Sequence, residues 1–160
     1  MTEDDEAHLR QAIGLAAEAR AAGNHPFGAL LVDADGHRMA VARNTVVVDH
    51  DPTGHAETNL VRLAARLAAE QGIDLSRTVL YTSTEPCAMC AGAIYWAGVG
   101  RVVYALAEVD LLVMTGGDHP DNPTLALPCR EVFARGSRPV VVDGPALEVE
   151  ARVVHQGFWT

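Results

Sequence analysis

Short apolar stretches with the character of β-strands alternate along this chain with longer stretches that have the spacing of amphipathic helices. The helical spacing, with apolar side chains three and four positions apart, covers residues 3–22, 55–70 and 87–97. The predicted strands are residues 27–33, 38–48, 78–82, 101–105 and 139–142, and a further helix is expected near the end of the chain. Asp35-Gly36 joins the first two strands as an antiparallel hairpin. This order predicts an α/β fold, a three-layer α/β/α sandwich around a five-stranded mixed sheet.

The length and composition fit a single folded domain. The chain has 160 residues, of which 49% are hydrophobic and 21% are charged. A chain of this length buries roughly two-thirds of its unfolded surface. No repeat, linker or break in composition divides it, so we expect one domain over residues 1–160.

The balance of charge argues against polyanionic partners. Twelve basic residues against twenty-one acidic ones give a formal net charge of -9, and a surface of that sign repels nucleic acid and anionic lipid. Every basic residue is an arginine, so a Walker phosphate loop and a Schiff-base cofactor site both lack their amine. The acidic start and the lack of a long apolar run predict a cytoplasmic protein with neither nucleic acid nor a membrane as its partner.

Two short motifs carry the residues that are suited to chemistry, and each lies at the start of a predicted helix. They are His55-Ala56-Glu57 and Pro86-Cys87-Ala88-Met89-Cys90. Backbone amides at a helix start favour negative charge, so the two cysteines are expected to be held as thiolates. Two thiolates and one imidazole suit zinc, and three protein ligands leave a fourth position for water, as in catalytic zinc sites. The carboxylate of Glu57 is placed to shuttle protons beside that water.

The cysteines also allow interpretations other than zinc binding. An isolated Cys-x-x-Cys pair is also typical of redox proteins, but the upstream His-x-Glu and the proline before Cys87 favour zinc. Cys129 stands alone and is interpreted as a small buried apolar residue.

The two motifs together resemble the signature of the cytidine-deaminase-like zinc deaminases, His-x-Glu followed by Pro-Cys-x-x-Cys. The resemblance extends to residues 24–29, 51–54, 84–85 and 93–97, and it covers about residues 5–118. It is strongest for the guanine deaminase and broader nucleoside-deaminase branch.

The resemblance implies roles for individual residues. It assigns His55, Cys87 and Cys90 as ligands of Zn²⁺ and Glu57 as the catalytic proton shuttle. It also implies a homodimer in which the C-terminal segment is exchanged and closes the neighbouring active site. The implied substrate-binding residues are Asn44, Phe27 and Asp118, with His155, Phe158 and Trp159 from the chain end.

Several of these residues also have structural interpretations. Asn44 lies within a strand pattern and is as well suited to cap a local turn. Tyr95 and Trp96 are expected in core or dimer packing. Residues 115–123 are interpreted as a surface loop near the strand ends. The histidines expected to face solvent or to satisfy a loop are His25, His37, His50 and His119.

The sequence therefore predicts a zinc-dependent hydrolase that deaminates a purine base or nucleoside, with guanine converted to xanthine and ammonia. The alternative within the class is a cytosine or cytidine deaminase. The catalytic residues are the same in these enzymes, and the pocket determines the size of the ring that is bound. A transfer-RNA adenosine deaminase ranks lower, because residues 153–160 carry no basic run that would hold RNA. The non-enzymatic alternative is a structural zinc protein.

Overall fold

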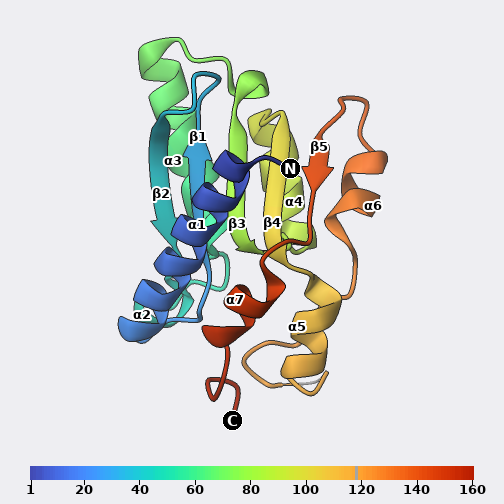
Figure 1. Cartoon of the computed structure of the whole chain (residues 1–160). Helices are drawn as coiled ribbons and strands as arrows, with labels where there is room; N and C mark the ends of the chain where they lie inside the picture. Colours follow the sequence, from blue (N-terminus) through green and yellow to red (C-terminus); the bar gives the residue numbers. More distant parts are fainter. Residues whose placement is uncertain (118) are drawn as a thin grey trace.

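The computed structural model describes residues 1–117 and 119–160. Its centre is a five-stranded mixed sheet with the strand order β2-β1-β3-β4-β5 (Figure 1). The strands are β1 (Gly28–Val32), β2 (Arg38–Arg43), β3 (Val79–Thr84), β4 (Arg101–Leu106) and β5 (Val141–Asp143). β1 pairs antiparallel with both β2 and β3, whereas β3, β4 and β5 run parallel. The predicted mixed sheet is confirmed.

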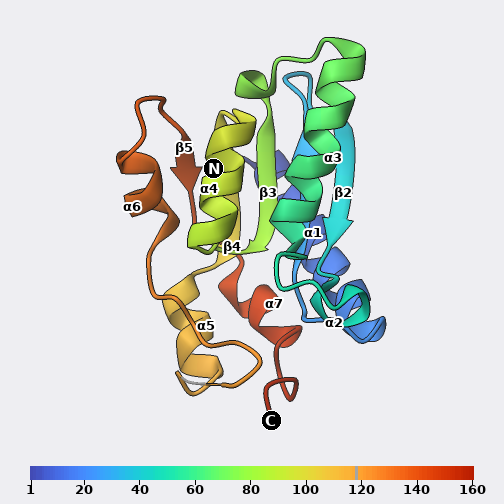
Figure 2. The same cartoon turned by 180° about the vertical axis from the view of Figure 1, so that it is seen from behind.

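Helices cover both faces of this sheet. On the face seen in Figure 1 lie α1 (Glu3–Ala21) and α7 (Glu148–Val153). On the face seen in Figure 2 lie α3 (Ala56–Gln71), α4 (Ala88–Ala97) and α6 (Cys129–Ala134). A short 3₁₀ turn, η1 (Leu75–Arg77), precedes β3. None of the helices in the described part of the chain is long and apolar enough to cross a membrane.

Alternation along the strands divides the interior into two apolar layers, one on each face of the sheet. In β1, Ala29 and Leu31 pack towards α3 and α4, while Leu30 and Val32 pack towards α1. Successive side chains of a strand point to opposite faces, so the sequence of a strand covered on both sides is a continuous apolar run. All five residues of β1 are accordingly buried.

The contact between α1 and the sheet is unusually close at Gly28. A β-carbon at this position would lie 2.5 Å from the backbone nitrogen of Ala16, so only glycine fits there. The start of α1 is fixed by a reciprocal capping box between Thr2 and Asp5.

Three parts of the chain depart from the predicted elements. The strand predicted over residues 38–48 ends at Arg43, and residues 46–49 form the short helix α2 (Val46–Asp49) instead. Side-chain amide oxygens explain the change: Asn44 Oδ1 accepts from the amide of Val46, and Asn24 Oδ1 accepts from the amides of Val47 and Val48. The helices α5 (Glu108–Met114) and α6 were not predicted, because each is only about two turns long.

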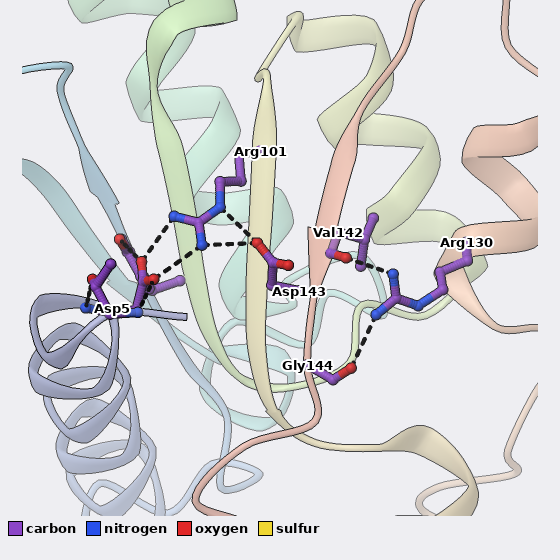
Figure 3. A network of polar contacts seen from close by, with 8 residues as sticks. Asp5, Arg101, Arg130, Val142, Asp143 and Gly144 are labelled. Carbon is purple, nitrogen blue, oxygen red and sulfur yellow. Dashed lines mark hydrogen bonds and ion pairs between the residues drawn. The ribbon is translucent and has the colours of Figure 1, made fainter.

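A partly buried ionic network holds α1 to the parallel half of the sheet (Figure 3). The guanidinium of Arg101 on β4 donates to Asp5 at 2.8 and 3.0 Å and to Asp143 on β5 at 2.8 Å. The hydroxyl of Tyr81 also donates to Asp5 at 2.7 Å. Although burial opposes ionisation, these donors hold the pKa of Asp5 well below its usual value.

Candidate metal centre and active site

The three predicted metal ligands meet at one point where two helices begin. His55 directly precedes α3, Cys87 directly precedes α4, and Cys90 lies in the first turn of α4. Nδ1 of His55 is 3.6 Å from the Sγ atom of Cys87 and 3.6 Å from that of Cys90. The three donor atoms all lie within 4.8 Å of one another. This arrangement brings together side chains that are more than thirty residues apart in sequence.

The chemistry of this donor set fits zinc. Hydrogen bonds from Cys90 and His55 lower the pKa of the Cys87 thiol to about 4, despite its burial. The contact with Cys87 in turn raises the pKa of His55. The hydrogen bond with Cys87 and burial raise the pKa of Cys90, so the expectation that both cysteines are held as thiolates fits Cys87 and not Cys90. Cysteine ligands release their protons when they bind a metal ion. One imidazole and two sulfurs are the donors that zinc takes in sites with three protein ligands.

Glu57 lies next to this centre, on the second residue of α3. Its side chain is buried, and Oε1 accepts a 2.6 Å hydrogen bond from the hydroxyl of Thr82 on β3. Burial raises the pKa of Glu57, and the hydrogen bond from Thr82 partly opposes that rise. The carboxyl group is therefore positioned by the sheet and is suited to exchange protons.

A cavity of about 300 Å³ opens onto His55, Cys87 and Glu57. Phe27 lines this cavity, as the sequence predicts for a pocket residue. His25 also lines it, which corrects the interpretation of His25 as a solvent or loop residue. The complete lining is His25, Phe27, Val46, Pro52, His55, Glu57, Thr84, Glu85, Cys87, Glu108, Leu111, Asp121, Asn122 and Pro123.

Glu85 and Glu108 are cavity residues that the sequence did not single out for a role. The carboxylate of Glu85 accepts from the amide of Glu108 at 3.2 Å and from the amide of Cys129 at 3.0 Å. It therefore fixes the starts of α5 and α6 at the edge of the cavity. Burial, together with the neighbouring Cys87 and Glu85, raises the pKa of Glu108 to about 7. The sequence signals for Glu85 were its place directly before Pro86 and the extension of the family resemblance to residues 84–85.

The side chain of Asn44 is buried, and its two polar atoms differ. Oδ1 accepts from the amide of Val46, so the turn-capping interpretation is confirmed for this atom. Nδ2 is buried without a partner among the described residues. The backbone amide of Asn44 donates to the carbonyl of Phe27 at 3.0 Å, which places Asn44 between two cavity-lining residues, Phe27 and Val46. Its role in binding a base stays a prediction.

The aromatic residues at the chain end pack behind the cavity wall of the same chain. The Trp159 ring centroid lies 5.5 Å from that of His25 and 6.1 Å from that of Phe27. His155 is 1% exposed, and its Nδ1 accepts from Trp159 Nε1 at 3.2 Å. The ring of Phe158 lies 6.0 Å from that of His25. These three residues support His25 and Phe27 from behind, and none of them is a lining residue of the cavity.

The remaining predicted residues have mixed outcomes. Asp118 lies outside the described residues. Cys129 is fully buried, as predicted. Trp96 is 82% exposed, which excludes the core packing considered for it, whereas Tyr95 is partly buried and its hydroxyl accepts from the amide of Ser137. The loop over residues 115–123 is not only a surface loop, because Asp121, Asn122 and Pro123 line the cavity.

Comparison with known proteins identifies the family. Residues 2–106 match the model of the cytidine and deoxycytidylate deaminase zinc-binding region. The chain is 41% identical over 159 residues to a probable cytosine deaminase of Schizosaccharomyces pombe, covering 99% of this chain and 94% of that protein. It is 43% identical over 106 residues to a guanine deaminase of Bacillus subtilis, which is 66% of either chain.

The fold gives the same result. A structure of guanine deaminase from Nitrosomonas europaea superposes with a TM-score of 0.76 at 27% identity, covering 96% of this chain and 83% of that one. The matched region contains both the His-x-Glu and the Pro-Cys-x-x-Cys motifs. The chain therefore belongs to the cytidine-deaminase-like zinc deaminases, and it is a zinc-dependent deaminase of nucleobases or nucleosides.

Proposed function

We propose that this protein hydrolyses the exocyclic amine of a free nucleobase, with guanine as the leading substrate. The observation that carries the proposal is that Glu57 and the metal ligands His55 and Cys87 face one cavity of about 300 Å³. That volume is at the lower end of the range for small-molecule sites, which suits a single ring system.

The mechanism assigns a task to each residue around the metal centre. His55, Cys87 and Cys90 would hold the zinc ion, which when bound acts as a Lewis acid and lowers the pKa of water towards neutrality. Glu57 accepts a proton from the attacking water and transfers it to the ring nitrogen beside the amine-bearing carbon. Glu57 then carries the second water proton to the amine. The carbon–nitrogen bond breaks, ammonia leaves, and the water oxygen remains on the ring.

Thr82 keeps Glu57 in position for these two transfers. Its hydroxyl holds Oε1 of Glu57 at 2.6 Å, which leaves the other carboxyl oxygen to exchange protons. The burial that raises the pKa of Glu57 makes the carboxyl group a better proton carrier near neutral pH.

Charge supports a free base over an RNA substrate. The cavity wall carries the carboxyl groups of Glu85, Glu108 and Asp121 besides that of Glu57, and the chain has a formal net charge of -9. A phosphate backbone at such a wall is repelled, whereas an uncharged base is not.

Two bases remain as candidates, and separate observations favour each. Guanine is favoured by the similarity to guanine deaminases in both sequence and fold. Cytosine is the second candidate, because the probable cytosine deaminase of Schizosaccharomyces pombe aligns over almost the whole chain, including the C-terminal segment. The predicted contacts of Asn44 and Asp118 with the base belong to this proposal.

Ammonia release from a panel of bases tests the proposal. Zinc-loaded protein is assayed with guanine, cytosine, adenine, guanosine and cytidine, and we expect guanine to have the highest kcat/KM. Glu57→Gln should retain zinc and lose ammonia release, because the amide cannot carry a proton. Asp118→Ala should lose guanine turnover while it keeps zinc. Faster turnover of cytosine than of guanine would select the second candidate, and no release from any base would reject the function.

We also propose that the protein is a homodimer. Trp96 on α4 is 82% exposed, and Met89 on the same helix is 37% exposed, so this surface helix presents large apolar side chains to solvent. Exposed aromatic residues of this size are typical of contact surfaces between proteins. The molar mass in solution, compared between the native protein and Trp96→Ser, tests the dimer.

A further inference from the structure

One carboxyl group holds both ends of a long segment beside the cavity. Residues 108–129, called the wall segment below, extend from the first residue of α5 to the first residue of α6. Oε2 of Glu85 accepts from the backbone amide of Glu108 at 3.2 Å, and Oε1 accepts from the backbone amide of Cys129 at 3.0 Å. The two oxygens of one side chain therefore join two amides that are 21 positions apart in the sequence.

The wall segment supplies part of the cavity lining. The residues that it contributes are Glu108, Leu111, Asp121, Asn122 and Pro123. The last three lie between the two ends of the segment, and residues 123–128 form neither a helix nor a strand. The position of this part of the lining therefore depends on how the two ends are held.

Few other contacts hold the wall segment. Among residues 1–117 and 119–160, Glu85 is the only residue outside 107–135 with a hydrogen bond to the backbone of the segment. Two side-chain contacts add to this: Asp110 pairs with Arg152 on α7 at 2.6 Å, and the ring of His119 lies 5.6 Å from that of Trp159. Neither contact joins the α5 end of the segment to the α6 end.

Direct packing between the two ends is incomplete. Figure 2 shows α5 and α6 apart from each other, joined by the loop of the wall segment. An apolar cavity of about 260 Å³ lies between them, lined by Val109 and Leu112 of α5, by residues 126–128 before α6, and by Glu85. Side chains that border such a gap lack partner atoms on one side. The carboxyl group of Glu85 therefore supplies the direct link between the ends.

We propose that Glu85 is a positioning residue for the substrate, because it fixes the wall segment against which the base binds. This inference rests on the proposed function. Glu85 is only 7% exposed, and hydrogen bonds from backbone amides to a carboxylate are among the stronger ones in proteins. Without them the wall segment is loosened and the base binds more weakly. The metal ligands and Glu57 keep their places, since they are held by α3, α4 and Thr82.

A purely structural role for Glu85 makes a different prediction. A carboxylate that caps two helix starts also stabilises the fold as a whole. Loss of that effect alone would lower the unfolding temperature and leave KM unchanged. A local effect on the wall segment, together with a change in KM, therefore separates positioning from general stabilisation.

Cys129 offers a matched pair of variants that tests a single hydrogen bond. Both Cys129→Pro and Cys129→Ala remove the thiol, but only the proline also removes the amide proton that bonds to Glu85. Proline is tolerated at the first residue of a helix, and Pro128 has a ψ of 138°, within the range that a following proline requires. Glu85→Gln changes the other side of the bond, because its side chain keeps only one acceptor oxygen.

Val32→Ala is the control for a general loss of stability. Val32 is 3% exposed and lies at the opposite end of β1 from Phe27, so its truncation weakens the core away from the cavity. All proteins are loaded with zinc. The measurements are zinc content, unfolding temperature, KM and kcat for the base that the native protein deaminates best, and hydrogen exchange of the backbone amides.

We expect Cys129→Pro and Glu85→Gln to retain a full equivalent of zinc. Amides of the wall segment should exchange at least about tenfold faster than in the native protein, whereas those of α3 should not. KM should rise about tenfold while kcat stays within about threefold. Cys129→Ala and Val32→Ala should lower the unfolding temperature and keep the native KM. If Cys129→Pro does not fold, Glu85→Gln is compared with Val32→Ala in the same way.

Three outcomes would overturn the assignment. They are native KM and native exchange in Glu85→Gln, equal effects of proline and alanine at position 129, and loss of zinc in Glu85→Gln, which would place its effect at the metal centre. If the native protein releases ammonia from no base, the proposed deamination fails. Hydrogen exchange in the Cys129 pair then still decides whether Glu85 holds the wall segment.

Discussion

The hydroxyl of Thr82 donates a 2.6 Å hydrogen bond to Oε1 of Glu57, and this contact joins the sheet to the first turn of α3. Thr82 is fully buried on β3, so its hydroxyl has no water to bond instead. The carbonyl oxygen of Thr84, 3.1 Å away, is a second and more distant acceptor for the same hydroxyl proton. The proton shuttle of the proposed mechanism is therefore held by a residue that is not part of the cavity lining.

Replacement of Thr82 by valine should impair proton transfer without loss of zinc. The hydrogen bond from Thr82 stabilises the charged form of Glu57, so its removal raises the pKa of Glu57 further. Glu57 then loses its proton at higher pH, and the acidic limb of the kcat/KM profile moves upwards in pH. We expect kcat to fall at least about tenfold. A pH profile of Thr82→Val identical to that of the native protein would contradict a positioning role, and Thr82→Ser should restore the native profile.

Loss of a sulfur ligand should remove both zinc and stability. Cys90→Ala leaves only His55 and Cys87, and the metal would no longer link the starts of α3 and α4. We expect less than about one-tenth of an equivalent of zinc by elemental analysis and a lower unfolding temperature. Cys129→Ala is the control, because Cys129 is fully buried but is not part of the donor cluster. That variant should lose stability to a new cavity while it retains zinc. A Cys90→Ala protein that still binds a full equivalent would disprove the ligand set.

Arg101→Met should destabilise the protein by about 3–5 kcal/mol, because the Asp5 carboxylate, only 2% exposed, would lose its charged partner. Since the pKa of Asp5 in the folded state lies below its ordinary value of 3.8, its stabilising effect is complete above about pH 4. The effect is lost as the pH falls through the lowered folded value. Urea unfolding at pH 7 and at pH 3 measures both effects. The double variant Asp5→Asn/Arg101→Met should recover part of the loss, and full stability of the single variant would argue against the network.

Docking of the chain end should weaken as the pH falls. Burial lowers the pKa of His155 to about 4, and Nδ1 accepts from Trp159, so the docked residue is neutral. His155 in the undocked chain end is protonated below about pH 6.5, whereas His155 in the docked chain end is protonated only below about pH 4. Stability of the docked state therefore decreases across this interval, by up to about 3 kcal/mol.

Trp159 reports this change directly. In Trp96→Phe it is the only tryptophan that remains, since the chain has two. We expect its fluorescence to shift between pH 6.5 and pH 4, and the shift should vanish in a variant that also carries His155→Phe. The exposed His37 provides a matched control, because His37→Gln should leave the transition unchanged. If the fluorescence of Trp159 in Trp96→Phe does not change between pH 6.5 and pH 4, the docked, neutral state of His155 is contradicted.

The sequence alone determined the mixed sheet, the covering helices α1, α3, α4 and α7, and the metal centre. These features depend on local patterns, namely apolar periodicity and the position of His55, Cys87 and Cys90 at the starts of two helices. The direction of a metal-ligating side chain at a helix start is set by the few residues around it. The motif therefore identified the donors, and the tertiary structure brought them together as predicted.

The tertiary structure decided which other residues face the cavity. Glu108 and Asn122 have no motif around them, and for His25 the only signal is the family resemblance of residues 24–29. These residues reach the site because the start of β1, the end of β4 and the loop after α5 meet at the same edge of the fold. The chain end was predicted to close the neighbouring subunit's active site, and within its own chain His155 and Trp159 lie behind His25 and Phe27. Contacts of this kind depend on packing between segments more than one hundred residues apart, and single-sequence periodicity contains no information about such distances.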